Sequence, residues 1–179
     1  MSLKHKILIA LALMALVVVV RLVPHLPNAA PVAAVGLFAG VYLGRSWALI
    51  LPVISMLISD MFIGFDTGWV TASVYFSFVL AGAIGIGLGR IKSPETVLGA
   101  SILASVCFYL ITNWAVWQFG TMYPHTLEGL LASYTLALPF FRNTLMGDLF
   151  YTAGLFGAYE GVRYLVRAAK ARRRWALAT

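Results

Sequence analysis

Long apolar runs separated by short polar breaks dominate the pattern along this chain. A membrane-spanning helix needs about 20 apolar residues, with a range of about 17–25, and six runs come close to that length. They predict helices at residues 7–23, 29–44, 47–63, 69–89, 96–117 and 139–166. Backbone polar groups in lipid must be paired internally, and strand-like alternation is absent from the sequence. The pattern therefore predicts an all-α integral membrane protein with six transmembrane helices.

Composition agrees with this class of protein. Of the 179 residues, 61% are hydrophobic and only 11% are charged, whereas a soluble domain averages about 45–50% apolar and about 25% charged residues. We expect a single domain that covers residues 1–179. The basic and apolar N-terminus resembles a signal peptide, but no small-x-small cleavage site follows it directly, so we expect it to remain as the first helix.

The cations sort to one side of the predicted bundle. With a cytoplasmic N-terminus and six spans, only Arg21 and Arg142 lie outside, which leaves 11 of the 13 lysines and arginines inside. The positive-inside rule requires this distribution. It predicts cytoplasmic N- and C-termini and a basic cytoplasmic tail, residues 167–179, that meets anionic lipid headgroups. The net charge of +7 is then an orientation signal, and no nucleic-acid partner is expected.

Polar side chains gather at the predicted outer ends of the helices, so we expect a small ligand to bind there from outside. Asp148 lies within the last helix, where an unpaired charge costs at least about 2.5–3.5 kcal/mol. We expect it to face the bundle interior and to pair with Arg21, with Arg142 or with a bound ligand. A purely structural ion pair explains Asp148 equally well.

The predicted ligand-binding residues are Arg21, His25, Asn28, Asp60, Asn113, Trp117, Arg142, Asn143 and Asp148. Arginine and asparagine side chains would hydrogen-bond the ligand, and the two aspartates would orient the arginines. Trp117 would stack on a ring of the ligand, although tryptophans at helix ends also form the aromatic belt of membrane proteins. Without Arg142 or Asn143, ligand binding is expected to be lost.

Small residues recur along the second predicted helix. Gly36, Gly40 and Gly44 are spaced by four residues, and Ala30 and Ala34 lie on a neighbouring face. Such spacing lets two helix backbones approach closely in lipid. These five residues therefore form either a docking face for a partner subunit or an internal packing surface of a small bundle.

Motifs for catalysis and for metal binding are weak. The sequence contains no H-E-x-x-H helix, no G-x-S-x-G turn and no cysteine cluster, since Cys107 is its single cysteine. We expect no catalytic residues, no metal, no cofactor and no enzymatic activity. Two alternatives stay open: a membrane-embedded enzyme that uses His25 or His125, and an assembly subunit that binds only other proteins.

Four longer motifs carry a resemblance to known proteins. They are RxxPHxPNxxPVAA at residues 21–34, SDxxxG at 59–64, TNxxVW at 112–117 and LPFFRNxxxxD at 138–148. These motifs resemble an uncharacterised family of small bacterial membrane proteins. That family and the six-helix pattern in turn resemble the substrate-binding S components of energy-coupling factor (ECF) transporters.

The resemblance implies an S-component-like bundle in the bacterial cytoplasmic (inner) membrane. S components capture vitamins or metal-bearing micronutrients from outside and generally dock onto a coupling subunit driven by two ATPases, although some work alone. Docking commonly uses small residues on the first helices, which Ala30 and Ala34 supply here. Cobalamin-type members use a cysteine near the outer surface, whereas Cys107 lies mid-helix. The sequence has no ATP-binding motif, so ATP-driven transport would need separate subunits.

Overall fold

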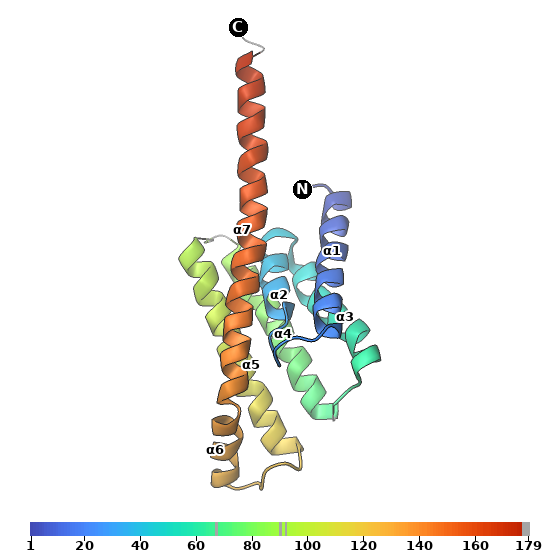
Figure 1. Cartoon of the computed structure of the whole chain (residues 1–179), viewed down its shortest axis with the longest axis vertical. Coiled ribbons are helices and arrows are strands. Elements are labelled where there is room, and N and C mark those ends of the chain that lie inside the picture. Colours follow the sequence, from blue (N-terminus) through green and yellow to red (C-terminus); the bar gives the residue numbers. More distant parts are fainter. Residues whose placement is uncertain (67, 90, 92, 177–179) are drawn as a thin grey trace.

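The computed structural model describes residues 1–66, 68–89, 91 and 93–176, with the side chains of 173–176 left out. Within these residues the chain forms helices and no strands (Figure 1). The helices are α1 (Leu3–Leu22), α2 (Val32–Tyr42), α3 (Arg45–Ile63), α4 (Gly68–Leu88), α5 (Pro94–Phe119), α6 (Leu127–Leu136) and α7 (Leu138–Ala176). The prediction of an all-α fold is confirmed.

Four of the described helices, α1, α3, α4 and α5, are long and apolar enough to cross a membrane. Their length and composition fit a membrane protein. The fifth long helix, α7, has 39 residues and carries a basic C-terminal segment. Its first part is apolar, because Asp148 is the only charged residue between positions 143 and 159.

Local signals in the sequence explain where several helices begin. Ser93 and Thr96 form a capping box at the start of α5, and Pro94 occupies the first turn, where its missing N–H costs nothing. Thr126 caps α6 by accepting a hydrogen bond from the Gly129 N–H. No helix was predicted between residues 117 and 139, so this ten-residue helix corrects the prediction.

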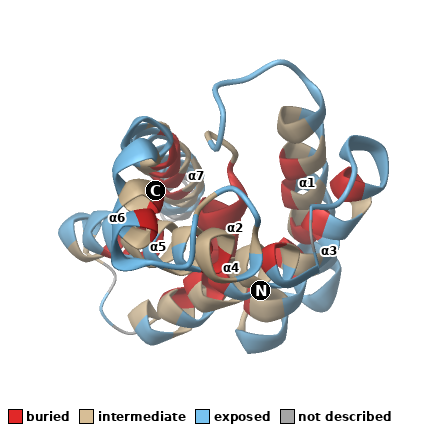
Figure 2. Ribbon diagram, turned by 90° about the horizontal axis from the view of Figure 1, so that it is seen from below, coloured by how far each residue is buried: buried red, intermediate tan, exposed pale blue. Residues whose placement is uncertain are grey.

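The second helix is shorter than expected and lies at the centre of the bundle. It begins at Val32, because the chain before it runs through a turn that ends at Pro31, and it ends just before Gly44, whose φ of 110° is left-handed. Eight of its eleven residues are buried. It contacts α1, α3, α4, α5 and α7, and Figure 2 shows its buried residues between α1 and α3 on one side and α5 and α7 on the other.

Glycines bring α2 and α4 into backbone contact. A β-carbon on Gly36 would lie 3.1 Å from the Gly82 nitrogen, and a β-carbon on Gly40 would collide with the Gly85 backbone. Ala34 is fully buried. Gly36, Gly40 and Ala34 therefore pack inside the bundle in this structure, whereas Ala30 and Gly44 are partly exposed.

The two chain ends lie on the same side of the bundle, and α6 marks the opposite side (Figure 1). The side chain of Lys6 donates a hydrogen bond of 2.7 Å to the Leu43 carbonyl, so the α2–α3 connection lies on the side of the chain ends. The basic segment of α7 extends beyond the helices at this end. Basic residues of α1, α3 and α7 thus share one end of the molecule.

The α2–α4 contact yields a prediction about stability. Changing Gly40 to Ala should lower the free energy of unfolding by about 1–3 kcal/mol, because the added methyl group has to displace the backbone of α4. Thermal unfolding of the protein in detergent measures this change. The matched control is Gly154→Ala on α7, where nothing lies within 4 Å of the new β-carbon; equal stability of the two variants would contradict the prediction.

Candidate ligand-binding cavity

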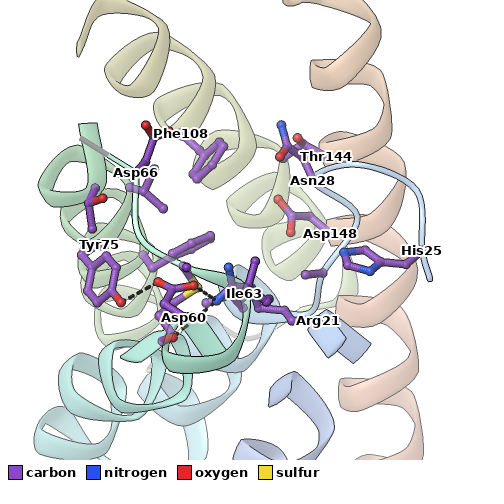
Figure 3. Close-up of a pocket in the computed structure, with 17 residues that line it drawn as sticks. Arg21, His25, Asn28, Asp60, Ile63, Asp66, Tyr75, Phe108, Thr144 and Asp148 are labelled. Atoms are coloured by element: carbon purple, nitrogen blue, oxygen red, sulfur yellow. Dashed lines mark hydrogen bonds and ion pairs between the residues drawn. The ribbon is translucent and has the colours of Figure 1, made fainter. Parts of the chain in front are cut away.

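A cavity of about 350 Å³ lies where the α1–α2 connection meets α3, α4, α5 and α7 (Figure 3). Its wall combines polar side chains with aromatic ones. The polar or charged members are Arg21, His25, Asn28, Asp60, Asp66, Thr71, Thr144 and Asp148, and the aromatic members are Tyr75, Phe78 and Phe108. Residues from six helices and two connections, distant in sequence, therefore face one space.

An ion pair between α1 and α3 forms one side of the cavity. Arg21 in the last turn of α1 contacts Asp60 on α3, with 2.7 Å between Nη1 and Oδ1. The same guanidinium donates to the Ser59 hydroxyl, and Tyr75 on α4 donates a 2.6 Å hydrogen bond to Asp60 Oδ2. Both carboxylate oxygens of Asp60 are thus used, and Asp60 is only 5% exposed.

Two residues in left-handed conformations shape the backbone around this pair. Asn28 has φ 64° in the α1–α2 connection, a conformation that asparagine tolerates better than most residues. Gly64 ends α3 with φ 102°, and its N–H donates to the Asp60 carbonyl at 2.8 Å. Both residues line the cavity, so the turns that the motifs at 21–34 and 59–64 require also build its rim.

Asp148 occupies the opposite wall, on α7. It is 3% exposed and accepts a 2.6 Å hydrogen bond from the Ser105 hydroxyl on α5. The expectation that Asp148 faces the bundle interior is confirmed. Of the three expected partners of Asp148, the structure excludes Arg21 and Arg142, because Arg21 pairs with Asp60 and the contact of Asp148 is with a neutral hydroxyl. The third, a bound ligand, stays a prediction.

His25 and Asn28 line the cavity from the exposed α1–α2 connection. His25 Nδ1 lies 2.9 Å from the Val23 carbonyl oxygen. Because a carbonyl oxygen only accepts, Nδ1 is the donor of this hydrogen bond. When the ring is neutral, its other nitrogen, Nε2, is an acceptor. Within the described residues no three His, Cys, Asp or Glu side chains come close enough together to hold a metal ion.

A second cavity of about 250 Å³ adjoins the first. The two share Asn28, Asp66, Val74, Phe108 and Thr144 in their walls. Asn113 lines this second cavity, and its side-chain nitrogen donates to the Tyr109 carbonyl on its own helix. Of the nine predicted residues, five line the first cavity, and a sixth, Asn113, lines only the second.

The remaining three predicted residues line neither cavity. Trp117 donates its indole N–H to the Pro124 carbonyl at 3.1 Å and so attaches the α5–α6 connection to α5. Arg142 is exposed, and Asn143 is partly exposed. At about 100° per residue, Arg142 and Asn143 lie about 120° and 140° around α7 from Asp148, so they point away from the face that lines the cavity.

Several cavity residues are not among the nine predicted ones. Tyr75, Phe78 and Phe108 are aromatic residues on apolar helices, and nothing in their local sequence separates them from residues that face lipid. Thr144 had a usable signal, because it is four residues from Asp148 and therefore on the same face of α7. Asp66 follows α3 in the same connection as Gly64, which places it at the rim.

Comparison with known proteins identifies the family of this chain. Residues 1–171 match a family of unknown function, DUF6580. The chain belongs to the DUF6580 family. No curated protein and no solved structure matches the sequence or the fold. The four motifs and the cavity that they line are therefore features of a DUF6580 protein, and any function has to be argued from the cavity itself.

The Arg21–Asp60 pair yields a second prediction about stability. Arg21→Met should destabilise the protein by about 3–5 kcal/mol, because it leaves the buried charge of Asp60 without its partner, and Asp60→Asn should cost less, because the side chain of Arg21 is 16% exposed. The double variant should cost clearly less than the sum of the single variants, as measured by thermal unfolding in detergent.

The control for this cycle is Arg163→Gln on α7. Arg163 forms a 2.8 Å ion pair with Glu160, but its side chain is 33% exposed and that of Glu160 is 45% exposed. An exposed pair contributes about 0–1 kcal/mol, so this variant should be nearly neutral. Strict additivity at Arg21 and Asp60 would show that the two charges do not stabilise each other.

Proposed function

We propose that this DUF6580 protein is a substrate-binding membrane protein that captures a vitamin or another small micronutrient from outside the cell. The observation that carries the proposal is the cavity, which holds Arg21, Asp60 and Asp148 among apolar helices. Ionisable residues within apolar membrane helices are costly and usually mark a binding site or a transport path. A bundle that needed only to pack would not gather three of them around one open space.

The dimensions of the cavity support a ligand of vitamin size. Small-molecule sites usually enclose about 300–1,000 Å³ and combine apolar walls with a few convergent polar groups. The main cavity of about 350 Å³ falls in this range, and its neighbour of about 250 Å³ lies just below it. Because Phe108 and Thr144 line both cavities, one ligand could extend along these residues from the first cavity into the second.

The proposed orientation puts both termini in the cytoplasm, with α1, α3, α4, α5 and α7 each crossing the membrane. The sixth crossing consists of α2 and the non-helical segment 23–31. Non-helical backbone at membrane depth is tolerated where protein buries it or where it lines a wet cavity, and residues of this segment line the cavity. The basic residues at the end that holds both termini agree with a cytoplasmic location.

We propose an S-component-like class of transporter, on the resemblance of the four motifs noted in the sequence. In that class a separate coupling subunit and two ATPases would supply energy, unless the protein works alone. The α2 face with Gly36 and Gly40 is covered by α4, so a coupling subunit would dock on another surface. We propose the lipid bilayer and the ligand as the obligatory partners.

A cavity-filling variant tests this function. The gently purified protein should contain a co-purified small molecule, detectable by native mass spectrometry, and Thr144→Phe should remove it because Thr144 lines both cavities. The matched control is Met146→Phe on the same helix, where the side chain is 59% exposed, and this variant should keep the ligand.

A screen of vitamins and related micronutrients by thermal shift provides the second readout, since a bound ligand raises the unfolding temperature by mass action. If the protein contained no co-purified molecule and no screened compound stabilised it, the proposal would lose its basis. A partner protein in fixed ratio, without any small molecule, would favour an assembly subunit. Turnover of a bound compound that disappears in His25→Ala would favour an enzyme.

A further inference from the structure

We propose that the ligand is a small organic cation, a protonated or quaternary amine with an apolar body, and that Asp148 is its counter-ion. This inference rests on the proposed binding function of the cavity and specifies the chemistry that the cavity selects. The observation behind it is that Arg21 and Asp60 pair with each other, whereas Asp148 has no cation as a partner among the described residues.

The only cation among the described lining residues is already neutralised. Arg21 pairs with Asp60 at 2.7 Å, and it also donates to the Ser59 hydroxyl. The second oxygen of Asp60 accepts the hydrogen bond from Tyr75. This group of side chains has no net charge, so Arg21 does not supply an uncompensated positive charge to an anionic ligand.

Asp148 is the opposite case. It is 97% buried, and its polar contact in the described part of the chain is the neutral hydroxyl of Ser105. The ion pairs between described residues join Arg21 to Asp60 and Arg163 to Glu160, and neither includes Asp148. A buried carboxylate is costly unless a cation pairs with it, and Figure 3 shows this carboxylate directed into the cavity across from Asp60 and Tyr75. Even with Asp66 left aside, the lining carries two carboxylates and one guanidinium.

Other atoms in the wall fit an ammonium group with an apolar body. Thr71 Oγ1 is buried and has no hydrogen-bond partner in the described residues, and Thr71 lines the same cavity. Phe78 and Phe108 lie with their ring centres 5.1 Å apart on the cavity wall. Aromatic faces attract a cation by about 0.5–2 kcal/mol, and the Thr71 oxygen accepts an N–H donor.

A bare metal ion fits this wall poorly. Calcium takes six to eight oxygen ligands, and magnesium demands near-ideal octahedral geometry. No three acidic, histidine or cysteine side chains of the described residues approach each other closely enough to hold a metal. The aromatic surface would remain unused by such an ion, whereas an organic cation uses both the carboxylate and the rings.

Three probes of similar size and different charge test the inference: benzylammonium, benzyl alcohol and benzoate. Their affinities for the purified full-length protein are measured by thermal shift over a range of concentrations. Benzylammonium should bind best, and Asp148→Asn should weaken its binding about 30-fold or more, as the loss of one partner of a buried charge pair does. The small molecule that co-purifies with the protein should also be cationic.

Two further variants separate charge from structure. Ser105→Ala removes the hydrogen bond to Asp148 but keeps its charge, so benzylammonium should still bind within about threefold of the unchanged protein. Phe108→Leu keeps Asp148 and removes one aromatic face, so binding should weaken by about threefold to 30-fold. This second variant keeps the inference testable if Asp148→Asn does not fold.

The inference is overturned if benzoate or benzyl alcohol binds better than benzylammonium, if Asp148→Asn binds benzylammonium as well as the unchanged protein, or if no probe binds. A neutral or anionic co-purified molecule that Thr144→Phe removes would overturn the charge assignment and leave the binding function intact. If the unchanged protein held no co-purified molecule and bound no screened compound, the binding function itself would be contradicted. The two failures are therefore distinguishable.

Discussion

A central helix that is too short to pass through the bundle governs the arrangement of the other elements. The eleven residues of α2 cover about 16 Å, whereas the 26 residues of α5 cover about 39 Å. Gly36 and Gly40 hold α2 directly against the backbone of α4, and side chains from four other helices cover the rest of it. Because α2 ends partway, the remaining length beside α5 and α7 is filled by the non-helical segment 23–31 and by a cavity. The cavity thus follows from the length of one helix.

The two buried aspartates that line this cavity, Asp60 and Asp148, differ in the partners of their carboxylates. Asp60 contacts a guanidinium from α1 and a phenol from α4, so its charge contributes to holding α1 and α4 against α3. That contribution matters because α1 buries only Ala10, Leu13 and Val17. Asp148 has one neutral donor, which is too little for a carboxylate in apolar surroundings. Asp60 already has its cation within the chain, whereas for Asp148 we propose a cation from outside the chain.

Much of the fold could be predicted from the sequence, because apolar runs of spanning length identify α1, α3, α4 and α5 directly. The short helices could not be predicted in this way. The start of α2 depends on the left-handed turn at Asn28 and on Pro31, and α6 is a ten-residue helix with a mixed pattern. Because a charge in lipid is costly, Asp148 could be predicted to face the interior. The sequence does not say which cation lies nearest to it. Only the packing of α1 against α3 decides that Asp60, and not Asp148, receives Arg21.

The four motifs converge on the cavities although they lie on different helices. The first two supply Arg21 and Asp60, together with the left-handed residues Asn28 and Gly64 that place them. The polar residues of the motif at 112–117 line the second cavity, and its tryptophan attaches the α5–α6 connection to α5. The motif at 138–148 ends on Asp148, which lines the first cavity. The residues that set the path of the backbone and those that face the cavity are therefore interleaved within the same short segments. A change of ligand in this fold would be made most easily at positions such as Phe78, Phe108 and Thr144, which line the cavity without fixing a turn or joining an ion pair.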